Sequence, residues 1–205
     1  YPVFESLPTR VNEFATDYVF CLNEDAEVYN IATNYYDTEK TAIFRNELLK
    51  NKFVFPAQWV IGNTDTYKTY DYGYFSLDAE GKLFHIKCVN GKPFVRNTHL
   101  ENSSGWHSFH PCETLRHNVY GILLSNDGRL ARVTLDANGA YYAQWLDMPN
   151  IDPDNDAVRI LGNIVAWNVT VSKPEGEYTY ALSAWALSLL ASEFIPAPSM
   201  VLASM

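Results

Sequence analysis

The sequence predicts an all-β fold, a propeller-like array of four or five small antiparallel sheets with one short helical insertion. Three observations support this fold class: hairpin-like segments recur at a nearly constant spacing, Gly and Asn stand at their turns, and aromatic residues are abundant, with 14 Tyr, 11 Phe and 5 Trp in 205 residues. Aromatic and β-branched residues suit the half-buried surface of a pleated sheet. A two-sheet sandwich is the alternative, because hairpins alone do not determine how sheets close.

The recurrence is clearest between residues 72–91 and residues 120–139. Both segments begin with Tyr-Gly, continue with an apolar run, turn at Asp or Asn close to a Gly, and end at a second Asn-Gly pair. Gly and Asn tolerate the positive φ that tight hairpin turns require. The corresponding glycines lie 47 or 48 residues apart, in the pairs Gly73 and Gly121, Gly81 and Gly128, and Gly91 and Gly139. We therefore expect each segment to form a β-hairpin.

Two fainter copies extend the series. Residues 164–182 contain an apolar run, a turn and a second run, and Gly176 lies 48 residues after Gly128, so we expect Gly81, Gly128 and Gly176 at equivalent turns. Residues 18–31 begin the series with a turn at residues 23–25. A period near 48 with a central hairpin is typical of propeller blades of about 40–50 residues. We treat residues 1–205 as a single β-rich domain.

One interruption of the repeat is predicted to be helical. Residues 38–51 carry apolar side chains spaced as on one face of an α-helix, namely Ile43, Phe44, Leu48 and Leu49. Asp37 or Thr38 can cap the N-terminus of this helix. The inserted helix explains why the hairpins near 18–31 and 72–91 are separated by more than one period.

The composition excludes several protein classes. The 15 Lys and Arg residues against 24 Asp and Glu residues give a net charge of −9, so we expect no nucleic-acid partner, because phosphate binding needs clustered basic residues. No run of 18 apolar residues is present, so we expect membrane contact only through segments outside this chain. The apolar content of 47% is too high for an intrinsically disordered chain.

The hairpin turns look like the Asp-box of many propellers, Ser/Thr-x-Asp-x-Gly-x-x-aromatic. Residues 76–84 (SLDAEGKLF) carry one residue more than this pattern, and residues 125–128 (SNDG) carry one fewer. More broadly, residues 53–192, with patterns such as GYFSLDAEGKLFHIK, resemble uncharacterised envelope proteins of gut anaerobes. Those proteins carry an aromatic-rich extracytoplasmic β domain beside membrane helices.

This resemblance implies a location in the periplasm or at the cell surface, with a membrane anchor outside this chain. It also implies a non-enzymatic interaction or sensing module whose partner is a protein or an envelope component, including a glycan. It brings no catalytic residues and no cofactor. The alternative from a different class is a carbohydrate-active or metal-dependent hydrolase that uses the loop at residues 99–117.

Aromatic side chains supply the candidate ligand-binding residues. Rings on a sheet surface can stack on sugars or dock a peptide, although most rings in an aromatic-rich β protein serve core and cross-strand packing. The candidates are Trp106, Tyr141, Tyr142 and Trp145.

Histidines are concentrated in residues 99–117, which hold four of the five. Imidazole and thiolate groups are zinc ligands, so the candidate metal-binding residues are His107, His110, Cys112 and His117. Their spacing matches no standard zinc motif. We expect a loop held by the packing of Trp106 and Phe109, without stoichiometric zinc.

Overall fold

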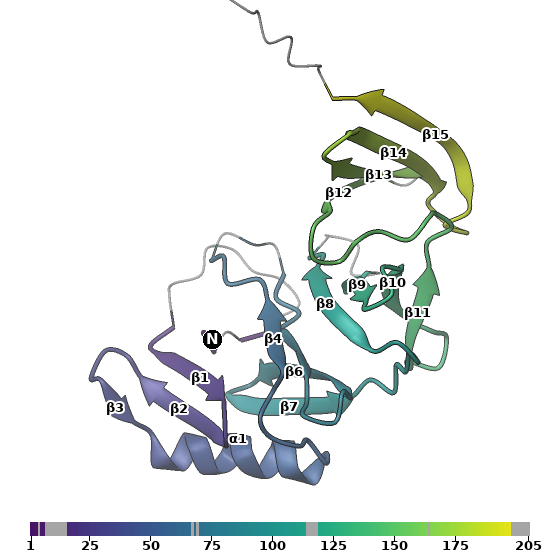
Figure 1. Cartoon of the computed structure of the whole chain (residues 1–205). Coiled ribbons are helices and arrows are strands. Elements are labelled where there is room, and N and C mark those ends of the chain that lie inside the picture. The colour runs from purple at the N-terminus through teal and green to yellow at the C-terminus, as the bar shows by residue number, and fades with distance from the viewer. Residues whose placement is uncertain are drawn as a thin grey trace, which may run out of the picture.

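The computed structural model describes residues 1–3, 5–6, 16–66, 68, 70–113, 119–163 and 165–197. Its strands form four antiparallel sheets, each built from strands that are consecutive in the sequence. We call them sheets A, B, C and D in chain order, and Figure 1 shows them following one another from the N-terminal to the C-terminal end. This arrangement confirms the predicted array of small antiparallel sheets with one short helix.

Sheet A contains three strands and packs beside the helix: β1 (Tyr18–Leu22), β2 (Ala26–Asn30), β3 (Tyr35–Tyr36) and α1 (Thr38–Lys50). Sheet B has four strands: β4 (Trp59–Gly62), β5 (Tyr74–Leu77), β6 (Leu83–Val89) and β7 (Lys92–Asn97). Sheet C also has four: β8 (Trp106–Pro111), β9 (Gly121–Ser125), β10 (Leu130–Leu135) and β11 (Tyr141–Trp145). Sheet D completes the series: β12 (Ala157–Gly162), β13 (Ala166–Lys173), β14 (Gly176–Ser183) and β15 (Leu189–Pro196).

The central hairpins of sheets B, C and D lie where the repeat predicts them. Gly81 and Gly128 stand between the second and third strands of sheets B and C, and Gly176 opens the third strand of sheet D. The first two turns share one backbone geometry, because Gly81 N donates to Asp78 O and Gly128 N donates to Ser125 O, each at 3.0 Å, with φ of 78° and 81°. The third turn is shorter, and Gly176 is the first residue of β14.

The glycines that open the second strands are required by close backbone approach. A Cβ atom at Gly73 would collide with the carbonyl oxygen of Ile86, and one at Gly121 would collide with that of His110. In both sheets the neighbouring strand therefore leaves no space for a side chain. The 48-residue spacing of these two glycines reflects this shared steric requirement.

The predicted helix is confirmed as α1, and its N-cap is Asp37, whose Oδ1 accepts a hydrogen bond from Lys40 N at 2.9 Å. The buried stripe consists of Thr41, Phe44 and Leu48, spaced by three and four residues. Two other apolar residues, Ile43 and Leu49, are exposed. Only one narrow face of the helix packs against the rest of the protein. The set of apolar residues that predicted the helix is therefore larger than the set that is buried.

Three hydrophobic cores fill the spaces between successive sheets. The first joins sheet A and α1 to sheet B, the second joins sheets B and C, and the third joins sheets C and D. Alternation along β9 shows how sheet C serves two cores, because Leu123 packs toward sheet B while Ile122 packs toward sheet D. The inner sheets are therefore buried on both faces.

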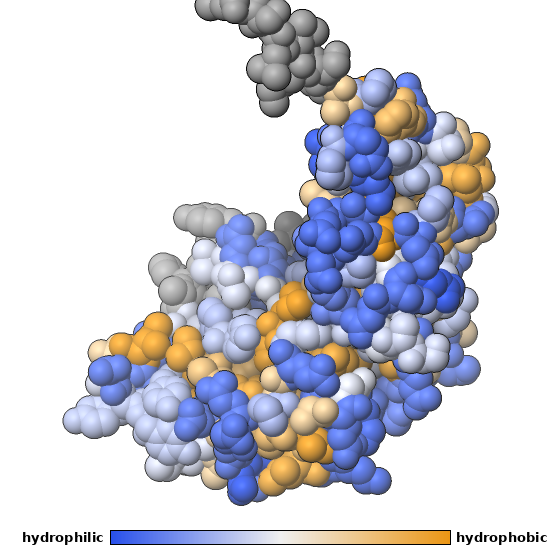
Figure 2. Space-filling model, viewed as in Figure 1, coloured by the Kyte–Doolittle hydropathy of each residue, from blue (hydrophilic) through white to orange (hydrophobic). Residues whose placement is uncertain are grey.

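Sheet D ends the described series, and its last strand is exposed along its whole length. The apolar side chains Leu189, Leu190, Phe194 and Ile195 of β15 are open to solvent, and Figure 2 shows hydrophobic residues gathered over this region. Among the described residues, no helix has the length and apolar character needed to cross a membrane.

Candidate functional site

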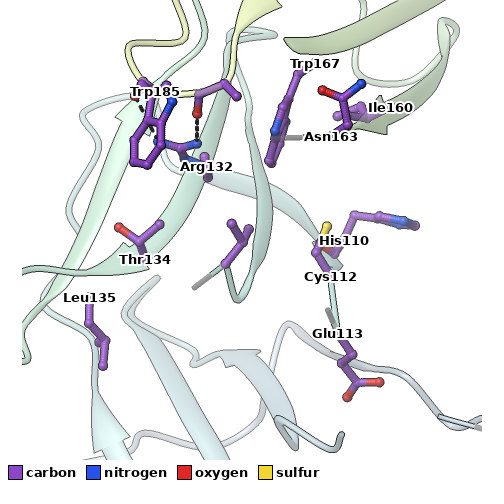
Figure 3. Close-up of a pocket in the computed structure, with 13 residues that line it drawn as sticks. His110, Cys112, Glu113, Arg132, Thr134, Leu135, Ile160, Asn163, Trp167 and Trp185 are labelled. Atoms are coloured by element: carbon purple, nitrogen blue, oxygen red, sulfur yellow. Dashed lines mark hydrogen bonds between the residues drawn. The ribbon is translucent and has the colours of Figure 1, made fainter. Parts of the chain in front are cut away.

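A cavity of about 730 Å³ lies between sheets C and D. Strand β10 of sheet C contributes Arg132, Thr134 and Leu135 to its wall, and sheet D contributes Ile160 and Trp167 from β12 and β13. Figure 3 shows these side chains facing a common space. The cavity is thus formed by two separate sheets, and neither of them could form it alone.

Arg132 brings a positive charge to one end of this cavity. Its Nη1 donates to Ala184 O at 2.6 Å, and its Nη2 donates to Gln144 Oε1 at 2.7 Å and to Trp185 O at 3.2 Å. The guanidinium carbon lies 5.5 Å from the centroid of the Trp167 ring. All three acceptors are neutral, and the buried Nε has no hydrogen-bond partner in the described structure. Desolvation lowers the pKa of Arg132, but a guanidinium remains charged at neutral pH.

Two indole rings stand near the guanidinium. Trp167 is the second residue of β13 and lies opposite Gly162, which has no side chain to occupy the space beside the ring. Trp185 lies in the connection between β14 and β15 and is 82% exposed. Figure 3 shows the Trp185 ring beside Arg132, with Trp167 facing both. A tryptophan this exposed at the rim of a cavity is available for contact with a ligand.

The opposite end of the cavity carries acidic side chains whose charge is partly neutralised by a nearby lysine. Glu113 Oε2 accepts a hydrogen bond from Asn63 Nδ2 at 2.7 Å, and its Oε1 accepts one from Tyr72 N at 3.0 Å. Lys68 Nζ lies 3.8 Å from Glu113 Oε1 and 2.7 Å from Asp71 Oδ2. Desolvation is the main cause that raises the pKa of Glu113. This cluster ties the end of β8 in sheet C to the segment that follows β4 in sheet B.

The thiol of Cys112 also lines the cavity. Burial raises its pKa to about 11, so the sulfur is protonated at neutral pH. A protonated thiol is a poor nucleophile. Cys112 therefore contributes to this site as a small apolar group.

A second polar arrangement lies between sheets B and C, around the buried His85 of β6. His85 Nε2 bonds to the carbonyl oxygen of Tyr72, so this nitrogen carries the proton and Nδ1 accepts from Tyr141 Oη at 2.6 Å. The imidazole stacks on Phe75 with centroids 4.6 Å apart. Burial lowers the pKa of His85 to about 3, which keeps the ring neutral, and burial also raises the pKa of Tyr141.

The structure separates the four aromatic residues predicted to bind a ligand. Trp106 is buried, with its ring stacked on Trp145 at 5.8 Å between centroids and its Nε1 bonded to Leu100 O. Tyr141 faces sheet B with these two residues, whereas Tyr142 is on the opposite face of β11 and is 52% exposed. Three of the four candidates are therefore part of the packing between sheets B and C.

The loop expected around the predicted metal-binding residues is wrong for Trp106–Pro111, because this segment forms strand β8. His107 and His110 belong to β8, and Cys112 follows directly, while His117 lies outside the described residues. Where the structure describes the chain, no three His, Cys, Asp or Glu side chains converge as a metal site would require. Because the candidate set includes His117, the expectation that it holds no stoichiometric zinc stays a prediction.

Arg132, Trp167 and Trp185 were not among the residues predicted to bind a ligand. The sequence offered a signal for Arg132, since this charged residue stands between the apolar residues Ala131 and Val133 of a predicted strand. A charged residue between such neighbours either faces solvent or faces a specific partner, and alternation alone does not distinguish these cases. The convergence of residues 132, 167 and 185 depends on the packing of sheet D against sheet C.

Comparison with known proteins gives a family but no activity. None of the curated proteins matches the sequence. A family model described as a domain of unknown function, DUF4857, matches residues 1–182. The match covers most of the chain, from sheet A into β14, and the chain therefore belongs to the DUF4857 family.

Proposed function

We propose that this chain is a non-enzymatic binding module, an interaction or sensing domain that receives its ligand in the cavity between sheets C and D. The observation that carries the proposal is the placement of Arg132 and two indole rings in a space of about 730 Å³. Ligand sites typically have volumes of about 300–1,000 Å³ and combine an apolar wall with few polar groups. The wall here has that character.

We further propose that the module acts on the extracytoplasmic side of a cell-envelope protein and that its ligand belongs to a partner protein or an envelope component. This part of the proposal rests on the resemblance of residues 53–192 to envelope proteins. The acidic balance of the chain, with a net charge of −9, supports a partner other than nucleic acid.

Two groups at the cavity support binding over hydrolysis. The Cys112 thiol is protonated at neutral pH because burial raises its pKa, so it does not offer a thiolate nucleophile. The Glu113 carboxylate is engaged by Asn63, by Tyr72 N and by the nearby Lys68. It therefore serves the connection between sheets B and C.

The neutral dye N-phenyl-1-naphthylamine tests this proposal by fluorescence titration. We expect saturable binding of one dye per chain to the native protein and its loss in Thr134→Trp, which places an indole in the cavity. The matched control is Thr33→Trp, because Thr33 is exposed in the turn between β2 and β3 and does not line the cavity. Unchanged binding in Thr134→Trp, or no saturable binding to the native protein, would contradict the proposal.

A further inference from the structure

We propose that the cavity between sheets C and D takes a small organic acid, with its carboxylate beside Arg132 and its apolar, ring-containing body against Trp167 and Trp185. This inference rests on the proposed function and names the ligand class of the same cavity.

The charge of Arg132 favours an anionic ligand. Arg132 is half-buried, and its hydrogen bonds all go to neutral acceptors. No carboxylate forms an ion pair with it in the part of the chain that the structure describes. Arg45 illustrates the contrast, because it is exposed and nevertheless pairs with Asp25 at 2.7 Å. A desolvated cation without a counter-ion is costly, and a ligand carboxylate would provide that counter-ion.

The two ends of the cavity differ in charge, and this difference orients the ligand. Glu113 occupies the end of the cavity away from Arg132 and Trp185 in Figure 3, so an anion is favoured at the arginine end and disfavoured at the other. A monoanion matches the single guanidinium better than a dianion such as a phosphate monoester. Asn163 lies on the cavity wall and uses its Oδ1 to accept from Val165 N and Ala166 N. Its amide nitrogen is thus a further donor on the wall.

The apolar side chains of the cavity would contact the body of the ligand. Trp167, Ile160 and Leu135 give the cavity an aromatic and aliphatic wall. Trp185 is exposed, but its main chain is held in place, because its carbonyl oxygen accepts from Arg132 and the next carbonyl, Ala186 O, accepts from Gln144 Nε2 at 2.8 Å. A ring-containing ligand would therefore pack against indole rings, and the main chain that carries the Trp185 ring is already held in place before binding.

The test compares two probes of the same shape by isothermal titration calorimetry, 2-naphthoate and its neutral amide 2-naphthamide. We expect naphthoate to bind the native protein about tenfold or more tightly than naphthamide, since hydrogen bonds to charged groups contribute about that much. Arg132→Gln should reduce naphthoate affinity to that of naphthamide. Arg159→Gln is the matched control, because Arg159 is an exposed arginine of β12, and it should leave the preference unchanged.

A salt titration on the native protein keeps the test independent of any variant. Raising NaCl from about 50 to about 300 mM should weaken naphthoate binding and leave naphthamide binding unchanged, because salt screens a charge pair that ligand binding forms. Equal affinity of the two probes would overturn the acid assignment while leaving the binding function in place. The absence of binding by either probe would overturn both. A naphthoate preference that survives in folded Arg132→Gln would also overturn the inference.

Discussion

His85 makes the stability of this protein sensitive to mild acid. The imidazole is 1% exposed, and burial lowers its pKa to about 3, whereas an unfolded chain has a histidine pKa of about 6.5. Between these two values the unfolded state binds a proton that the folded state does not bind. The free energy of unfolding therefore falls as the pH falls through this range.

The size of the effect follows from the pKa difference. One pKa unit corresponds to about 1.4 kcal/mol, so His85 alone lowers the free energy of unfolding by about 2 kcal/mol between pH 7 and pH 5. Glu113 acts in the opposite direction, because its raised pKa makes protonation favour the folded state. The carboxyls with lowered pKa values, Asp127, Asp152 and Asp156, lose their contribution only at lower pH.

Urea denaturation at pH 7 and pH 5 measures this effect, with His85→Phe as the comparison. Phenylalanine retains a ring against Phe75 and cannot titrate in this range. The variant loses the hydrogen bonds to Tyr72 and Tyr141, so it should be less stable at both pH values. We expect the native protein to lose about 2 kcal/mol more than the variant on acidification. An equal loss in both proteins would refute the reasoning.

Three further predictions concern stability and are checked by urea denaturation at neutral pH. Gly73→Ala should cost about 1–3 kcal/mol more than Gly81→Ala, because both have φ of 78° but only Gly73 has backbone in the space of a Cβ; equal losses would contradict the close approach. Asp37→Ala should cost about 1 kcal/mol through loss of the N-cap, and no change would mean that α1 does not depend on this cap. Leu123→Ala should cost about 2–5 kcal/mol and Leu190→Ala less than about 0.5 kcal/mol, since the first is fully buried and the second is exposed; similar losses would contradict the assigned cores.

The hairpins and the helix could be predicted because their determinants are local. Gly81 and Gly128 mark equivalent turns through their positive φ, and Asp37 marks the start of α1 through its side chain. Gly121 is required by the close approach of the adjacent strand, and the same close approach occurs 48 residues earlier at Gly73. Each of these signals depends on residues close in sequence, or on neighbouring strands of one sheet.

The candidate site could not be predicted in the same way. The histidines of residues 99–117 are close in sequence, but those at 107 and 110 lie along β8, and the buried histidine with two polar partners is His85. The cavity joins Arg132 of sheet C to residues of sheet D that follow it by 28 positions or more. Periodicity indicates that strands form sheets, but it does not specify which side chains of two packed sheets leave a space between them.

The most direct test of the binding proposal uses the side-chain N–H signals of the five tryptophans in an NMR titration with 2-naphthoate. Trp167 and Trp185 line the cavity between sheets C and D, while Trp106 and Trp145 stack between sheets B and C. We predict that the signals of Trp167 and Trp185 shift with increasing ligand and that those of Trp106 and Trp145 stay in place. Shifts confined to Trp106 and Trp145, or no shift at any indole, would contradict binding in this cavity.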